Sequence, residues 1–249
     1  MKQLKDYSKK RFKILKDSLE SYRHILDPEK LHQIRVEIKK IKVIINLINS
    51  CAHKFKGHRH FVPFRTIFRR AGEIRQPEIF YRLLLLYQIG GVSDAKIPKS
   101  KKIDVLSQAF QKDVPQFIES VSIQKKKLKM YFDKVSKTEA RKYLRKKKLE
   151  VERLMFPSFN SEKLHMARKI SKEIIYLHWV DKHKKADPFY VEIENIIGQW
   201  HDKQMLLPIL RKSKAADEVT ALVAASKEDL VKLKMLASRH YSPSLNVND

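Results

Sequence analysis

Apolar residues recur at helical spacing along most of the chain, and no segment alternates apolar and polar residues long enough to form a strand. The clearest apolar stripe lies within residues 28–51 and consists of Leu31, Ile34, Ile38, Ile41, Ile45 and Ile48. Asp27 and Pro28 predict where this helix begins, because Asp is a favourable N-cap and Pro suits the first helical position. The pattern therefore predicts an all-α fold.

The same periodicity predicts a series of helices, with prolines or polar segments between several of them. Their expected ranges are 4–25, 28–51, 61–72, 77–87, 103–112, 115–133, 137–155, 161–183, 188–199, 201–213 and 216–238. Residues 92–102 are the most loop-like stretch and provide the expected boundary inside the chain. Only 5 of 249 residues are glycine, which argues against an all-β sandwich and against Gly-rich phosphate loops.

Composition adds a strong positive charge to this helical picture. Lys and Arg number 54 and Asp and Glu 28, so the net charge is +26, and 43% of the residues are hydrophobic, enough for a core. A chain with this charge attracts polyanions over long distances. A single cysteine, Cys51, excludes an internal disulfide and a Cys-based zinc site, as is common in a reducing compartment.

Membrane and secretion signals are not expected from the sequence. The first 22 residues carry lysines throughout, without the apolar run of a secretory signal. No stretch of about 18 uncharged apolar residues is present, so a membrane span is not expected either. The sequence predicts a cytoplasmic protein with no membrane partner.

A row of cations follows the apolar stripe of the second helix. Its members, at spacings of three, four and three residues, are His32, Arg35, Lys39 and Lys42. Each follows a stripe residue by one position, which places the row about 100° around the helix from the buried face. Gln33 and Glu37 fall outside this row, so no acid within it neutralises the cations. A bound anion would relieve their repulsion, whereas the alternative interpretation is a solvated basic face.

The row has a second copy later in the chain. His165, Arg168 and Lys172 repeat the spacing of three and four residues. Each row is followed by a segment centred on a glycine, residues 70–76 and 197–202 respectively. Two diverged copies of one helical unit explain this order, and we expect the repeats to span 1–95 and 103–240.

This doubled pattern resembles the CHAD family, the conserved histidine α-helical domain. The resemblance rests on residues 31–42, 72–75, 164–176 and 198–202, and it covers nearly the whole chain. It implies one domain of two pseudo-symmetric, four-helix-bundle-like repeats that binds inorganic polyphosphate on a basic surface. The contacts carried over by matching are His32, Arg35, Lys39, Lys42, His165, Arg168 and Lys172. Gln76 stands where the family usually has Asp, and Ile175 where a basic residue is common.

Other cations extend the candidate site. Arg75 lies in the first glycine segment, and Arg141, Arg145 and Lys148 share one face of a predicted helix, with Lys146 and Lys147 beside them. We expect Arg75, Arg141, Arg145 and Lys148 to contribute to polyphosphate binding. A solvated helix face is the alternative for the last three.

Binding is predicted rather than catalysis. A linear polyphosphate carries repeated negative charge and no bases, so its binder needs spaced cations, among which Arg can grip phosphate oxygens in pairs. Hydrolysis of a phosphoanhydride normally needs carboxylates that hold Mg²⁺, and the rows contain none, so no metal or other cofactor is expected. His53, His58 and His60 are expected in a connector rather than at a metal site.

The partner predicted from these features is inorganic polyphosphate and, more broadly, other polyanions or phosphate and sulfate ions. Association with polyphosphate granules in the cytoplasm is a further expectation. Two alternatives remain open, an RNA-binding helical protein and a polyphosphate-processing enzyme, and the net charge alone would also suit nucleic acid.

Overall fold

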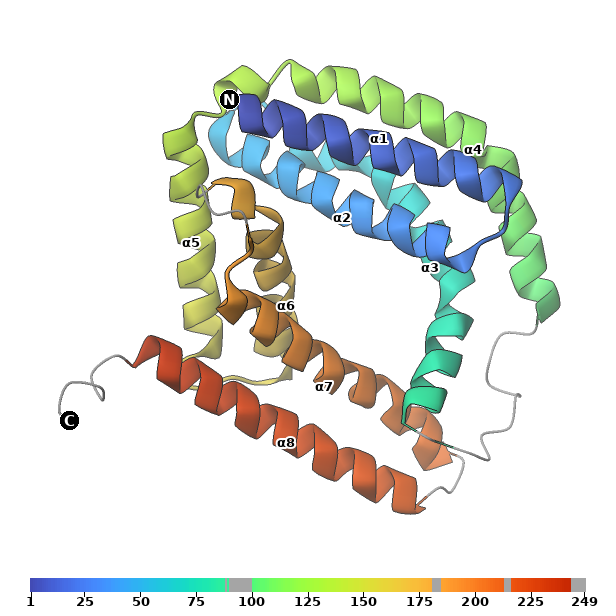
Figure 1. Ribbon diagram of the computed structural model, residues 1–249, viewed down its shortest axis with the longest axis vertical. Helices are drawn as coiled ribbons and strands as arrows, with labels where there is room; N and C mark the ends of the chain where they lie inside the picture. Colours follow the sequence, from blue (N-terminus) through green and yellow to red (C-terminus); the bar gives the residue numbers. More distant parts are fainter. Residues whose placement is uncertain (88, 90–99, 181–184, 213–215, 243–249) are drawn as a thin grey trace. The chain divides into compact units, whose positions relative to one another are not determined.

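The computed structural model describes residues 1–87, 89, 100–180, 185–212 and 216–242. Their regular elements are all helical (Figure 1), which confirms the all-α fold class for the described part of the chain. The elements are α1 (Lys2–His24), α2 (Pro28–Cys51), α3 (Gly57–Leu86), α4 (Ser100–Lys129), the 3-10 helix η2 (Phe132–Lys134), α5 (Lys137–Met155), α6 (Ser161–Tyr176), the 3-10 helix η3 (His178–Val180), α7 (Pro188–Lys212) and α8 (Ala216–Tyr241).

Several predicted helices form where the sequence places them. Helix α2 begins at Pro28 as expected, and Oδ1 of Asp27 accepts a hydrogen bond from the backbone N–H of Glu29 at 2.8 Å. Every residue of its predicted apolar stripe is buried. Helices α1, α5 and α8 agree with the predicted ranges within a few residues.

Pro157 lies between α5 and α6 and Pro188 begins α7, as predicted, whereas Pro77 and Pro115 do not separate helices. Helices α3 and α4 run through Pro77 and Pro115, and α7 runs through the predicted break at residue 200, so three pairs of predicted helices are each one long helix. An internal proline loses one hydrogen bond and costs roughly 3 kcal/mol. Buried apolar residues on both sides, such as Ile74 and Leu83 around Pro77, offset this cost by continuing the packed stripe.

Other boundaries also differ from the prediction. Helix α3 begins at Gly57, so His58 and His60 lie in its first turns and not in a connector. Helix α4 begins at Ser100, inside the segment 92–102 that was expected to be a loop, and residues 92–99 of that segment lie outside the described residues. Helix α6 ends at Tyr176 instead of 183, and η3 follows it.

The chain divides into two compact units. Unit 1 comprises Met1–Tyr81 and Ile97–Tyr143, and unit 2 comprises Arg82–Lys96 and Leu144–Asp249. These bounds differ from the expected repeats, 1–95 and 103–240, because α4 packs against α1 and therefore belongs to unit 1. The repeat boundaries themselves stay a prediction.

Unit 1 has a core between α1, α2, α3 and α4. Helix α1 packs along α2 and against α4 (Figure 1). The ring of Phe12 meets that of Phe64 edge-on at 6.0 Å, and Tyr22 meets Phe110 in the same way at 5.4 Å. These contacts join α1 to α3 and to α4, while α1 also packs along α2, whose buried stripe the cation row borders.

Unit 2 has α7 as its central helix, which packs against both α6 and α8. Its core includes Leu164 of α6, Ile193 and Ile197 of α7, and Leu233 of α8, all of them fully or almost fully buried. None of the helices, within the residues that the structure describes, is long and apolar enough to cross a membrane.

Candidate functional site

The first cation row lies along the edge of the buried face of α2. His32 and Lys42 are exposed, while Arg35 and Lys39 are half-buried. The placement follows from the sequence spacing, because each cation comes one residue after a buried member of the stripe. The predicted row is therefore a real feature of one helix face.

Aromatic residues of α3 support this row. The guanidinium of Arg35 lies 3.9 Å from the centre of the Phe68 ring, and its Nη1 donates a hydrogen bond to the Phe68 carbonyl oxygen. Nζ of Lys39 lies 5.8 Å from the same ring, and Nζ of Lys42 lies 5.2 Å from the ring of Phe61. A ring face attracts a cation through its quadrupole and leaves the positive charge in place.

Gly72 allows the close approach of Arg35 to α3. A Cβ at this position would overlap Nη1 of Arg35 and would lie 3.0 Å from its Cζ. The glycine segment predicted from sequence therefore has a physical role, since only a residue without a side chain leaves room for the guanidinium. Burial, followed by the charge of Arg75, lowers the pKa of Arg35. A neighbouring anion would oppose both effects.

Arg75 lies behind the row rather than in it. Its side chain is only 5% exposed, with Nη1 2.7 Å from Nδ1 of His32 and Nε 3.5 Å from a carboxylate oxygen of Glu78. Arginine has no acceptor, so Nδ1 of His32 accepts this hydrogen bond and the ring proton sits on Nε2. Arg75 was predicted as a ligand contact; the structure shows it buried against His32, and its part in ligand binding stays a prediction.

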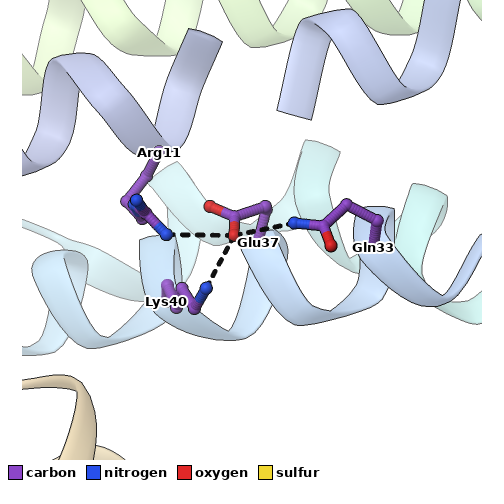
Figure 2. A network of polar contacts seen from close by, with 4 residues as sticks. All are labelled: Arg11, Gln33, Glu37 and Lys40. Carbon is purple, nitrogen blue, oxygen red and sulfur yellow. Dashed lines mark hydrogen bonds and ion pairs between the residues drawn. The ribbon is translucent and has the colours of Figure 1, made fainter. Parts of the chain in front are cut away.

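Glu37 is the acid closest in sequence to the first row, and it points away from it. Its side chain is fully buried against α1, where Oε1 accepts from Arg11 at 3.1 Å, Gln33 at 3.1 Å and Lys40 at 2.7 Å (Figure 2). In the described residues no carboxylate lies within ion-pair distance of Arg35 or Lys42. The expectation that Glu37 does not neutralise the row is confirmed.

The second row differs in this respect. In unit 2, Nε of Arg168 lies 3.0 Å from Oε1 of Glu194, and Nζ of Lys172 lies 2.9 Å from the same oxygen. An acid therefore neutralises part of this row, although the row itself contains none. Glu194 comes from α7, a different helix, so the spacing within α6 could not reveal it.

The glycine contact does recur in unit 2. A Cβ on Gly198 would lie 2.9 Å from Nη2 of Arg168 and 3.4 Å from its Cζ. Next to this contact, the rings of His165 and His201 lie 5.7 Å apart. Burial lowers the pKa of both histidines, and the charge of Arg168 lowers them further.

Asp202 lies inside α7 and not at a helix end, so it is not a helix cap. Its negative charge acts on His201, where it raises the pKa against the larger lowering effects of burial and Arg168.

The cations of α5 form a separate group. Arg141 and Arg145 are exposed, and Lys148 is half-buried, with its Nζ 3.8 Å from Asp187 and 5.7 Å from the centre of the Tyr190 ring. Helix α5 passes from unit 1, which holds Arg141, to unit 2, which holds Arg145 and Lys148. Their part in a common site stays a prediction.

Sequence reasoning missed four residues that contact or border the rows. These are Phe61, Phe68 and Arg65 of α3 and Glu194 of α7. Arg65 is exposed and shares a helix face with the two phenylalanines. Phe68 and Glu194 each lie four residues before the glycine that receives an arginine, and aligning the two copies on that glycine would have identified both positions.

The histidines predicted to lie in a connector fall within the part of the chain that the structure describes. There, no group of three or more His, Cys, Asp or Glu side chains is arranged to hold a metal ion. His60 stacks on Phe55, with ring centres 4.5 Å apart, and its Nδ1 lies 3.1 Å from Oε1 of Gln124.

Comparison of the chain with protein-family models, with curated proteins and with solved structures gives no match.

Proposed function

We propose that this protein binds inorganic polyphosphate without catalysis, through the cation rows of α2 and α6. The observation that carries the proposal is a repeated contact, in which an arginine guanidinium packs against a glycine of a neighbouring helix: Arg35 against Gly72 and Arg168 against Gly198. Each arginine has a histidine three residues before it and a lysine four residues after it, on the same helix face. This repeated arrangement of histidine, arginine, lysine and glycine supports a CHAD-like domain with two related repeats.

The fixed geometry of Arg35 favours anion binding. Its carbonyl hydrogen bond and the Phe68 ring hold the guanidinium in place before any ligand arrives, so less side-chain entropy is lost on binding. His32 is held in the same way by Arg75 and keeps its proton on Nε2 as a hydrogen-bond donor. A phosphate chain running along α2 would meet these donors one helical turn apart.

The aromatic contacts favour polyphosphate over RNA. Single-stranded nucleic acid binds largely by stacking its bases on aromatic rings. Phe68 and Phe61 lie beside the row, but Arg35 covers the first ring and Lys42 the second. A ligand that offers charge without bases suits such a surface better.

Non-catalytic binding also fits the use of the acids around the rows. Glu37 forms ion pairs with Arg11 and Lys40, and Glu194 forms ion pairs with Arg168 and Lys172. Carboxylates engaged in this way are poor ligands for the Mg²⁺ that phosphoanhydride hydrolysis normally requires. Cytoplasmic location and association with polyphosphate granules stay predictions from the sequence.

The decisive experiment titrates the full chain into labelled long-chain polyphosphate at physiological salt. We expect Arg35→Gln to weaken binding about tenfold, as expected for the loss of a charge-assisted contact. The matched control is Arg239→Gln, which removes the same charge from an exposed position on α8. Equal weakening by both variants would reduce the effect to net charge and contradict a defined site.

Two further measurements separate the alternatives. Long-chain polyphosphate should displace bound RNA at a lower phosphate concentration than RNA displaces polyphosphate, and the reverse order would favour the RNA-binding alternative. Incubation with polyphosphate and Mg²⁺ should release no orthophosphate above a protein-free control, and steady release would establish an enzyme.

A further inference from the structure

The cation row of unit 2 already holds an anion that belongs to the protein. Oε1 of Glu194 lies 3.0 Å from Nε of Arg168 and 2.9 Å from Nζ of Lys172, so one carboxylate oxygen bridges both cations. Burial raises the pKa of Glu194, but the hydrogen bonds and charges of Lys172 and Arg168 outweigh burial, and the net pKa is lowered. Glu194 is therefore ionised at neutral pH.

Unit 1 has a phenylalanine in the corresponding place. Phe68 lies four residues before Gly72, as Glu194 lies four residues before Gly198. Phe68 meets Arg35 and Lys39, which are the counterparts of the two cations that Glu194 bridges. The same position thus carries a neutral ring in one unit and a full negative charge in the other.

We infer that Glu194 is an internal counterion that occupies the position of a ligand phosphate in the row of unit 2, so that the row of unit 1 provides the stronger anion site. This inference rests on the proposed function, and it concerns which row binds and what sets its affinity. A phosphate group that binds to Arg168 and Lys172 must first displace the carboxylate. At Arg35, which has no carboxylate within ion-pair distance in the described residues, the Phe68 ring requires no such exchange, because it stabilises the cation without cancelling its charge.

The test compares Glu194→Gln with Glu192→Gln in the full chain. Both variants remove one negative charge from α7, but Glu192 is exposed and has no contact with the row. Long-chain polyphosphate is the probe, and melting temperature and helix content are followed for each variant. We expect Glu194→Gln to tighten binding about five- to tenfold and Glu192→Gln to stay within about twofold of the unchanged chain.

The salt dependence of the affinity provides a second measure, because a change in net charge far from the row should not alter it. The slope of log affinity against log salt should steepen by about 0.7 for each additional phosphate that the freed cations neutralise. With two cations released from Glu194, the expected change is up to about 1.4. Glu192→Gln should leave the slope unchanged.

The converse variant places the counterion in unit 1. Phe68→Glu should weaken polyphosphate binding about tenfold by giving Arg35 an internal anion, whereas Thr66→Glu, exposed on another face of α3, should weaken it far less. This variant keeps the inference testable even if Glu194→Gln proves unstable.

The outcomes distinguish the inference from the proposed function. If Arg35→Gln weakens binding but Glu194→Gln behaves like Glu192→Gln, or weakens binding, the counterion role is wrong and the proposed function stands. If the unchanged chain shows no binding that depends on Arg35, the proposed function fails first and the counterion role with it.

Discussion

Gly72→Ala is expected to reveal how tightly the Arg35 side chain is held. The new Cβ would overlap Nη1 of Arg35, so the guanidinium has to leave its place on α3. It would lose its hydrogen bond to the Phe68 carbonyl and its contact with the Phe68 ring. The helix backbone can stay as it is, because the obstructing atoms belong to the end of a flexible side chain.

The magnitudes of the two effects oppose each other. Ala in place of Gly inside a helix stabilises it by about 1 kcal/mol. The lost hydrogen bond of a charged donor costs about 1.5–3 kcal/mol, and the lost cation–π contact costs about 0.5–1 kcal/mol. We therefore expect Gly72→Ala to lower the free energy of unfolding by about 1–3 kcal/mol and to weaken polyphosphate binding as strongly as Arg35→Gln does.

A double-mutant cycle measures the contact directly. In an Arg35→Ala background the obstruction is gone, so Gly72→Ala should raise the free energy of unfolding by about 1 kcal/mol, as determined by urea denaturation. Gly198→Ala serves as a milder comparison, because its Cβ would lie 2.9 Å from Nη2 of Arg168 and a small side-chain shift relieves the contact. Equal effects of Gly72→Ala in both backgrounds would refute the packing of Arg35 against Gly72.

Two other outcomes are expected. Polyphosphate affinity should rise as the pH falls from about 7.5 to 5.5, because His165 and His201 take up protons beside a polyanion. Burial, and then neighbouring cations, lower the pKa values of both histidines in the free protein. Calorimetry in buffers of different ionisation enthalpy measures the proton uptake, and an affinity independent of pH would contradict the prediction. In the free protein the sign reverses, since the unfolded chain binds these protons more readily, and stability falls over the same range. Glu37→Ala should lower the free energy of unfolding by about 3–5 kcal/mol in urea, because buried Arg11 loses its carboxylate, and unchanged stability would show the buried network to be dispensable.

The sequence predicted the first row well because the information is local. Helix α2 has an N-cap, a first-position proline and a continuous apolar stripe within 24 residues. The register of the stripe then determines which side chains border it, so the placement of Arg35 and Lys42 needs no knowledge of the rest of the fold. The same reasoning failed at Pro77, where packing of the surrounding helix outweighs the local preference for a break.

The partners of the rows could not be predicted in this way. Glu194 and Phe68 belong to other helices and lie 22 or more residues further along the chain than the cations they contact. Helix spacing relates residues three or four positions apart, and it says nothing about which neighbour a side chain meets across an interface. The glycine segments did carry such information, since a glycine inside a packed helix usually marks a close approach.

The contrast between Phe68 and Glu194 bears on how a chain with a net charge of +26 can keep a cation row at its surface. An acid beside the row lowers the repulsion among the cations, but it also cancels the field that attracts a polyanion. An aromatic face stabilises each cation by about 0.5–1 kcal/mol or more and leaves that field intact. If the inference holds, the residue at this one position, Phe68 on α3 or Glu194 on α7, determines whether the adjacent arginine is balanced within the protein or by a ligand.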